Sequence, residues 1–456
     1  MSREACTQNL RKLAEWAAAT PLSALPRETL VRAARVVADD LAAITGARTE
    51  PEVERFQERV LARASREEAT VFRGGRRRTD RLSASVANAV AADWLELDEG
   101  FRPASCHAGL YVLPALLAEA EARNLPAGEM LRAVVLAYEI VTRVAMTFSQ
   151  KTVTMQSHGR FAAVGAAASV ALSRNADSKL LLAALGTAVT LIGPSPRTHL
   201  AAGILSRNVW PASGAWSGAM AVEWAECGIT GAPEAFYDVY AEVLGNTANP
   251  DALVNGLGER WSILEGYTKI YACCQHLHAA VEATVAMRED VLKEGRLEDV
   301  AAIRVDTHPL AIALVNDRPG STLGAKFSMS HAVAAALVTG TGGAEAFSAG
   351  TLTDPAIDRL RGKLSVAPYE ANLPPPNDRP SRVTIEFKSG RRVQRECLSA
   401  VGGPDRPLPP EIVFEKITAL AAPAYPKMRP ILEELSTLPA GPMARGWADT
   451  VAEFCG

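Results

Sequence analysis

The strongest constraint on the fold of this chain is a change in hydrophobic periodicity near residue 265. Before it, alanine is abundant and apolar residues recur at a spacing of three and four, as in amphipathic and buried helices. After it, apolar and polar residues alternate over 300–308 and 381–387, and Ser389 and Gly390 predict a hairpin turn into a strand over 391–397. The sequence therefore predicts a mainly α fold, in which a large all-helical domain is joined to a smaller α+β domain.

The same patterns place the domain boundaries. We expect a helical domain over residues 1–265 and an α+β domain over 266–404. Helical periodicity returns at 411–420 and 430–437, so residues 405–456 are expected to complete the helical domain. A chain of 456 residues is long enough for two domains of this kind.

Charge and composition exclude several classes of partner. The net charge is −3 and the isoelectric point is about 6.2, which argues against a nucleic-acid partner. The longest apolar stretch, 180–193, is too short to cross a membrane, and no apolar run follows a basic N-terminal head. The seven cysteines are an odd number and mostly scattered, which is typical of a reducing compartment. We expect a soluble cytoplasmic protein that binds neither nucleic acid nor membrane.

Residues 269–278 concentrate reactive side chains. They hold a lysine, a tyrosine, two of the seven cysteines and two of the seven histidines, a set suited to acid–base chemistry near neutral pH. Zinc is the competing interpretation, but adjacent cysteines cannot easily ligate one tetrahedral ion. For one of the two thiols, packing as a small apolar side chain is the better explanation. No metal-ligand spacing and no glycine-rich phosphate loop after a strand is present, so we expect no metal and no cofactor.

Four segments resemble segments of the MmgE/PrpD family. They occur in the family's order and span nearly the whole chain, which makes the resemblance specific where one match would be weak. The segments are 95–100 with the following 107–109 and 112–118, then 161–169, 269–278 and 324–337. On these motifs the chain is identified as a member of the family.

The resemblance implies a fold and a chemistry. The family fold is a large helical domain with a smaller α+β lid domain, the active site lies between them, and homodimers are common. Known activities include 2-methylcitrate dehydratase, cis-aconitate decarboxylase and iminodisuccinate epimerase. All act on small di- or tricarboxylates without a metal or organic cofactor, and all make or protonate a carbanion-like centre next to a carboxylate.

The resemblance also implies catalytic residues. His107 occupies the position of a catalytic histidine, and Lys269 could bind carboxylate, stabilise an enolate or act as a base. Tyr271 could donate a proton. Cys274 stands where the decarboxylase branch has a histidine, and a thiolate is a competent base toward carbon acids. The alternative for Tyr271 is a hydrogen-bonded polar group at the domain interface.

Glu96 and Asp98 lie in the acidic segment of the family and are further catalytic candidates. In a helix their spacing would place them on different faces, so we expect at most one to point into the site. The alternative is a helix end with solvated acids. The family has aspartate at the position of Glu96 and threonine at that of Gly100.

Substrate binding is assigned to another set of residues. Many relatives have lysine at the position of Arg207, and a guanidinium there would hold a carboxylate in a bidentate manner. A surface ion pair is the alternative. His158 or Arg160 would contact substrate near the family's His-Pro turn. His278 matches a closing histidine, and His331 stands where one branch has a tyrosine; both could instead be polar groups at the interface.

These assignments favour one reaction among several. Removal of a proton α to a carboxylate needs a base on one face and cations for the enolate. Departures from the family at Glu96, Gly100, Arg207 and Cys274 weaken a methylcitrate dehydratase or a cis-aconitate decarboxylase. A thiol opposite a histidine or lysine suits two-base epimerisation, so we predict an epimerase of the iminodisuccinate type. A non-catalytic carboxylate-binding protein is the alternative from a different class.

Overall fold

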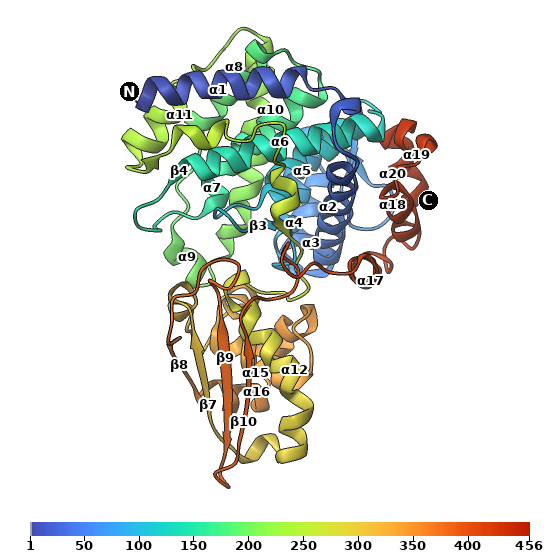
Figure 1. Cartoon of the computed structure of the whole chain (residues 1–456). Helices are drawn as coiled ribbons and strands as arrows, with labels where there is room; N and C mark the ends of the chain where they lie inside the picture. Colours follow the sequence, from blue (N-terminus) through green and yellow to red (C-terminus); the bar gives the residue numbers. More distant parts are fainter. Residues whose placement is uncertain (1) are drawn as a thin grey trace.

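The computed structural model describes residues 2–456 and consists of a broad helical domain with a narrower domain extending from it (Figure 1). The centre of the helical domain is α7, which packs against α5, α6, α8 and α10. The bounds are α5 Ala108–Ala122, α6 Ala127–Thr147, α7 Ser157–Ser173, α8 Ser178–Thr190 and α10 Val209–Glu226. Small residues bring these helices close together: a Cβ atom on Gly214 of α10 would lie 2.3 Å from Cβ of Ala162 in α7.

The two ends of the chain complete this domain. The N-terminal helix α1 crosses one side of it, and the C-terminal helices α17 to α20 pack on α2, α5 and α6 (red in Figure 1). The N-terminal helices are α1 Ser2–Ala19, α2 Arg27–Gly46, α3 Pro51–Leu61 and α4 Arg81–Ala92. The C-terminal ones are α17 Pro410–Ala421, α18 Met428–Leu435, α19 Ala440–Ala444 and α20 Trp447–Cys455. Residues far apart in sequence therefore share one hydrophobic core.

The smaller domain, here called the lid, is a four-stranded sheet with helices packed against it. The strand order is β10–β9–β7–β8; β7 and β8 are parallel and the other pairs are antiparallel. The elements are β7 Val300–Thr307, β8 Leu364–Pro368, β9 Ser381–Phe387 and β10 Arg392–Cys397, with α12 His278–Glu294, α14 Thr322–Lys326, α15 Met329–Thr339 and α16 Pro355–Arg361. The predicted hairpin of β9 and β10 is confirmed. The sequence analysis did not anticipate β8, because this short edge strand has no fully buried residue to produce a clear alternation.

The chain crosses between the domains twice, at neighbouring places. On the way out, β6 (Gly266–Tyr267) pairs antiparallel with β3 (Gly100–Phe101) of the helical domain. On the way back, the carbonyl of Gly402 accepts a hydrogen bond from the Thr268 amide at 3.0 Å. The predicted fold class is confirmed. The boundaries near 265 and 404 fall within this crossing and stay proposals.

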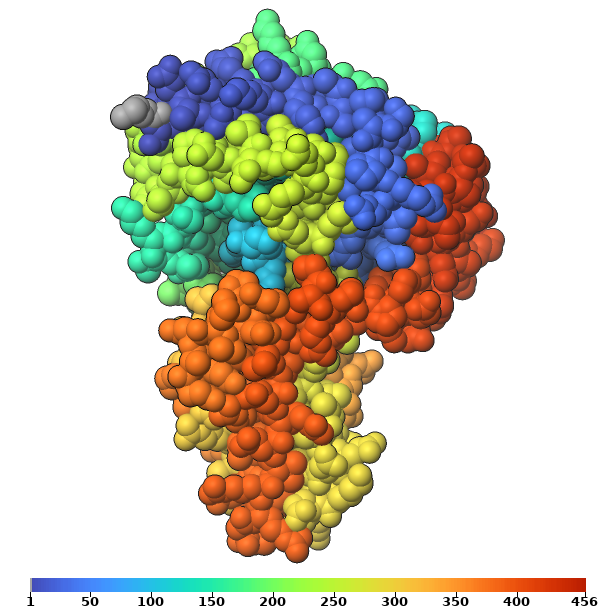
Figure 2. Space-filling view, viewed as in Figure 1, coloured from blue at the N-terminus to red at the C-terminus, as the bar shows by residue number. Residues whose placement is uncertain are grey.

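Figure 2 shows the waist of the molecule, where the lid (yellow to orange-red) meets the broader helical domain. Within residues 2–456, no helix combines the length and the apolar character needed to span a membrane.

Candidate active site

The acidic segment between α4 and β3 is irregular, which allows neighbouring carboxylates to converge. Glu96 has a φ of 54°, and both Glu96 and Asp98 are buried. The ammonium of Lys269 lies 3.2 Å from Asp98 Oδ1 and 3.6 Å from Glu96 Oε2. The expectation that at most one of the two acids points into the site assumed a helical segment, and the bent backbone brings both to Lys269.

His107 immediately precedes α5 and pairs with Asp98. Its Nδ1 atom lies 2.6 Å from Asp98 Oδ2. Burial would raise the pKa of Asp98, but the charges of Lys269 and His107 outweigh burial and hold that pKa well below its usual range. The ionised carboxylate can only accept, so Nδ1–H donates to it, and whenever the ring carries a single proton Nε2 keeps its lone pair. Nε2 has no hydrogen-bond partner within residues 2–456, and the side chain is 14% exposed. This geometry would allow Nε2 to accept a proton from a bound molecule.

Arg207 lies behind this group as a fully buried cation. It pairs with Glu96 and, at 2.6 Å, with Asp93 Oδ2. Burial alone would lower the pKa of Arg207, but the charges of Asp93 and Glu96 raise it. Its guanidinium is engaged within the protein, so neither the surface ion pair nor a freely available clamp describes it.

His158 extends the same network. Its Nε2 lies 3.0 Å from Asp93 Oδ2, and its Nδ1 lies 2.9 Å from the Tyr111 hydroxyl. Burial, followed by the charge of Arg207, lowers the pKa of His158 well below its usual value, so the ring is neutral. The ring centroids of His158 and His107 are 4.9 Å apart, nearly edge to face. His158 therefore supports His107 from the side of α7.

Lys269 and Cys274 have protonation states that limit their roles. Burial would lower the pKa of Lys269, but Asp98 and Glu96 raise it, so the ammonium persists and is an electrostatic group rather than a base. Burial, then the charge of Glu96, raises the pKa of Cys274, which keeps it a thiol. Cys274 is half-buried and its amide donates to the Lys326 carbonyl at 2.9 Å. Its neighbour Cys273 is completely buried in the core, which fits the packing interpretation for one thiol.

Comparison with known protein families connects this geometry to the sequence. The MmgE/PrpD N-terminal domain matches residues 11–245, and the MmgE/PrpD C-terminal domain matches residues 271–437. The chain belongs to the MmgE/PrpD family. Dehydratases and related enzymes make up this family, which supports an enzyme of this general type. A search among curated proteins finds no significant match.

Three residues that the family motifs suggested lie away from Lys269. The ring of Tyr271 packs against His278, with ring centroids 5.4 Å apart. His331 contacts the Ala346 carbonyl at 3.1 Å inside the lid. Arg160, in the first turn of α7, donates to the Phe148 carbonyl at 2.6 Å. The structure does not join Tyr271, His331 or Arg160 to the carboxylate network, and their suggested roles stay predictions without geometric support.

His278 lies between the network and the lid core. Its Nε2 is 3.0 Å from the Cys273 carbonyl. Burial, then the positive charge of Lys269, lowers the pKa of His278 to about 3. A neutral imidazole that holds the turn of residues 273–278 fits a structural role beside the site better than contact with substrate.

The structure adds residues that the motifs did not single out. Asp93 lies three residues before Glu96 and could have been found from its charge. Lys326 lies within a recognised motif; its ammonium donates to the Trp94 carbonyl at 2.8 Å and links the lid to the acidic segment. Tyr267 is paired with Gly100 across β3 and β6, and no pattern in the sequence marks it.

Two arginines approach the turn of residues 273–278, here called the Cys274 turn, from different domains. Arg379, from the lid, donates to the side chain of Gln275 and to the Arg102 carbonyl. Arg197 begins the short helix α9 (Arg197–Ala201), which contacts α14 of the lid. Burial lowers the pKa of His276, and the charges of Arg379 and Arg197 contribute to the same shift. Within residues 2–456 the Arg197 side chain has no ion pair, so it remains available for an anion.

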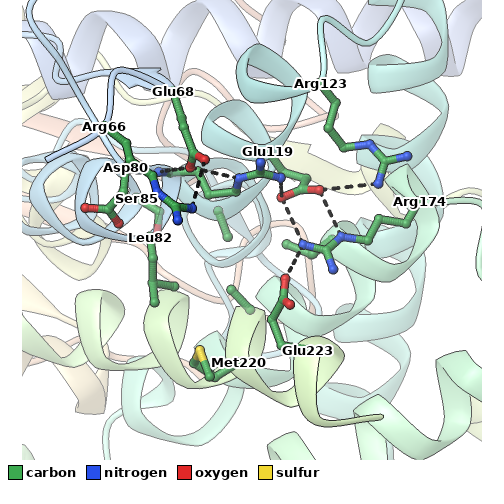
Figure 3. Close-up of a pocket in the computed structure, with 14 residues that line it drawn as sticks. Arg66, Glu68, Asp80, Leu82, Ser85, Glu119, Arg123, Arg174, Met220 and Glu223 are labelled. Atoms are coloured by element: carbon green, nitrogen blue, oxygen red, sulfur yellow. Dashed lines mark hydrogen bonds and ion pairs between the residues drawn. The ribbon is translucent and has the colours of Figure 1, made fainter. Parts of the chain in front are cut away.

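A separate cavity of about 560 Å³ lies among α4, α5, α7 and α10 (Figure 3). At its centre Glu119 accepts from Arg81 at 3.1 Å and from Arg174 at 2.8 Å, and Arg174 also meets Glu223 at 2.6 Å. Its charged side chains pair with one another, so we do not place the chemistry there.

No group of three His, Cys, Asp or Glu side chains across residues 2–456 is suited to hold a metal ion.

Proposed function

We propose that this protein removes a proton α to a carboxylate of a small di- or tricarboxylate, with His107 as the base. The observation that carries the proposal is the Asp98 carboxylate, which accepts from His107 on one oxygen and meets Lys269 on the other. Asp98 fixes the tautomer of His107 and stabilises the imidazolium that forms. Lys269 supplies positive charge for the enediolate.

The charge balance supports a second place for the substrate carboxylates. Asp93, Glu96 and Asp98 outnumber Lys269 and Arg207, and burial raises the pKa of Asp93 to about 6 despite the opposing charge of Arg207. This network has no surplus cation for a polyanionic substrate. We therefore assign carboxylate binding to Arg197 and Arg379, because guanidinium groups bind carboxylates in a planar, charge-assisted way.

Among the reactions open to such a site, we place epimerisation of the iminodisuccinate type first. His107 contacts Asp98, and the charges of Glu96 and Lys269 act on the Cys274 thiol. His107 would take the α-proton, and the Cys274 thiol would return one to the other face. One direction then begins with His107 unprotonated and Cys274 as a thiol, and the reverse direction begins with His107 protonated and Cys274 as a thiolate.

The experiment is proton exchange in heavy water with methylcitrate, cis-aconitate, iminodisuccinate and citrate, followed by NMR. Epimerisation incorporates deuterium at an inverted carbon and forms no alkene. An unsaturated acid with loss of water would instead establish a dehydratase, and release of carbon dioxide a decarboxylase. Exchange in none of the acids would leave a carboxylate-binding protein.

Two further proposals rest on the family resemblance. We expect turnover to persist after extensive chelation, and a loss that zinc or iron restores would overturn cofactor independence. We also propose a homodimer, to be checked by sedimentation equilibrium; a monomer at micromolar concentration would contradict it.

A further inference from the structure

The ring of Tyr267 lies directly over the backbone of Gly100. The two residues face each other in the β3–β6 ladder. A Cβ atom on Gly100 would lie 2.3 Å from the Tyr267 hydroxyl oxygen, much closer than van der Waals contact. Only glycine at position 100 therefore leaves room for the phenol in this place.

The hydroxyl of Tyr267 has no partner in the protein. The residue is 7% exposed, and no hydrogen bond joins its oxygen to any residue of 2–456. The hydroxyls of three other buried tyrosines, Tyr111, Tyr138 and Tyr240, all pair within the protein. Since buried tyrosine hydroxyls normally find a partner, this one is suited to a ligand.

The surroundings of Tyr267 are those of the proposed reaction. It is two residues from Lys269, and it faces Gly100, two residues after Asp98. Burial raises the pKa of Tyr267, while the charges of Lys269 and Arg379 oppose that rise and those of Asp98 and Cys274 add to it. The phenol therefore stays protonated near neutral pH and can donate a hydrogen bond.

We infer that Tyr267 is a catalytic residue that donates a hydrogen bond to the substrate carboxylate as it becomes the enediolate, and that Gly100 makes room for it. No bond to Tyr267 forms or breaks: the α-proton goes to His107 Nε2, and the electron pair of the C–H bond enters the carboxylate. A hydrogen bond from Tyr267 to a carboxylate oxygen of the substrate becomes stronger as negative charge develops on that oxygen. The inference rests on the proposed function, because it assigns a role within the same site.

The test compares Tyr267→Phe with the unmodified protein. The variant lacks only a hydroxyl that bonds to no protein group, so the melting temperature should not change. We expect deuterium exchange to slow about 100-fold, the usual loss for one such donor. Tyr237→Phe is the matched control and should leave exchange unchanged, since α11 (Ala235–Tyr237) lies on the side of the helical domain away from the lid (Figure 1).

A binding measurement separates this inference from the proposed function. The nitronate of 3-nitropropionate imitates an enediolate, and succinate imitates the ground state. Tyr267→Phe should weaken nitronate binding at least about 10-fold and leave succinate binding unchanged. If both ligands bind equally well to variant and parent, the inference is overturned even when exchange occurs. If no acid exchanges but nitronate binding depends on Tyr267, the proposed reaction falls and the donor role stands.

The role of Gly100 is tested by a double-mutant cycle. Gly100→Ala should displace the phenol and reduce exchange to the level of Tyr267→Phe. The double variant should be no slower than either single variant, because both remove the same interaction. Fully additive losses, or normal exchange in Gly100→Ala, would contradict the coupling of Gly100 and Tyr267.

Discussion

The Nδ1 atom of His107 lies 2.6 Å from Oδ2 of Asp98, and the other oxygen of that carboxylate faces Lys269. This pairing determines which imidazole nitrogen is available to substrate. We predict that Asp98→Asn lowers the rate of deuterium exchange by at least about two orders of magnitude, because an amide no longer enforces the basic tautomer or stabilises the imidazolium. Asp251→Asn, at an exposed position, is the control and should retain full activity. Normal exchange in Asp98→Asn would remove the pair from the mechanism.

Lys269→Ala should affect both activity and stability. The ammonium is completely buried between two carboxylates, so its removal leaves uncompensated charge in the core. We expect a loss of exchange of at least about 100-fold and a fall in the free energy of unfolding of about 3–5 kcal/mol, measured by urea denaturation. Lys388→Ala, at an exposed lysine, should change stability by less than about 0.5 kcal/mol. A fully stable Lys269→Ala protein would mean that the carboxylates take up protons instead.

Glu99 should make stability depend on pH. Burial raises its pKa to about 8 from an ordinary 4.5, against the opposing charge of Arg32. Between those pH values the folded protein holds a proton that the unfolded chain releases, so stability falls as pH rises, by at most about 1.4 kcal/mol per pH unit. Urea denaturation from pH 5 to pH 8 measures this slope. Glu99→Gln should flatten it, and an unchanged slope would assign it to other groups.

Cys274→Ser should distinguish catalysis from packing. A serine hydroxyl is too weak an acid to replace a thiol, so one direction of proton transfer should slow far more than substrate binding weakens. The measurement is deuterium exchange starting separately from each enantiomer. Cys273→Ala is the neighbouring control and should leave the ratio of the two directions unchanged, because Cys273 is enclosed in the core. If the two directions of exchange slow equally, or not at all, in Cys274→Ser, another group must donate the proton.

Arg197→Gln and Arg379→Gln should weaken dicarboxylate binding selectively. Each variant removes one charge-assisted contact, so succinate affinity should fall about 10-fold, while the affinity for succinamide, which has no carboxylate, changes little. Isothermal titration measures both ligands. Arg63→Gln, at an exposed arginine near the end of α3, is the control. A parallel loss for both ligands would indicate a structural defect instead of a lost carboxylate contact.

The sequence was informative where chemistry is local and less so where it depends on contacts between distant segments. Helical and alternating periodicity predicted the two kinds of domain, because the spacing of apolar residues reflects which face of a helix or strand is buried. The acidic segment, His107 and Lys269 were predicted from motifs, and the structure brings them together. Whether those residues act as assigned stays a prediction.

Side-chain direction in irregular segments could not be predicted in this way. Glu96 reaches Lys269 because its backbone takes a φ of 54°, which no spacing rule anticipates. Tyr271 turns toward the lid although it is two residues from Lys269. Arg379 reaches the Cys274 turn from more than a hundred residues later in the chain, through tertiary contacts alone.

The small β3–β6 ladder also determines which groups would move if the lid changed its orientation. Tyr267 and Lys269 belong to the segment that pairs with the helical domain, beside His107 and Asp98. Arg379 belongs to the lid. A swing of the lid would therefore carry away Arg379, the proposed carboxylate-binding residue, together with Cys274, whose amide is bonded to Lys326 of the lid. It would leave His107, Asp98, Lys269 and Tyr267 assembled. Capture of the acid and removal of its α-proton would then be separable events.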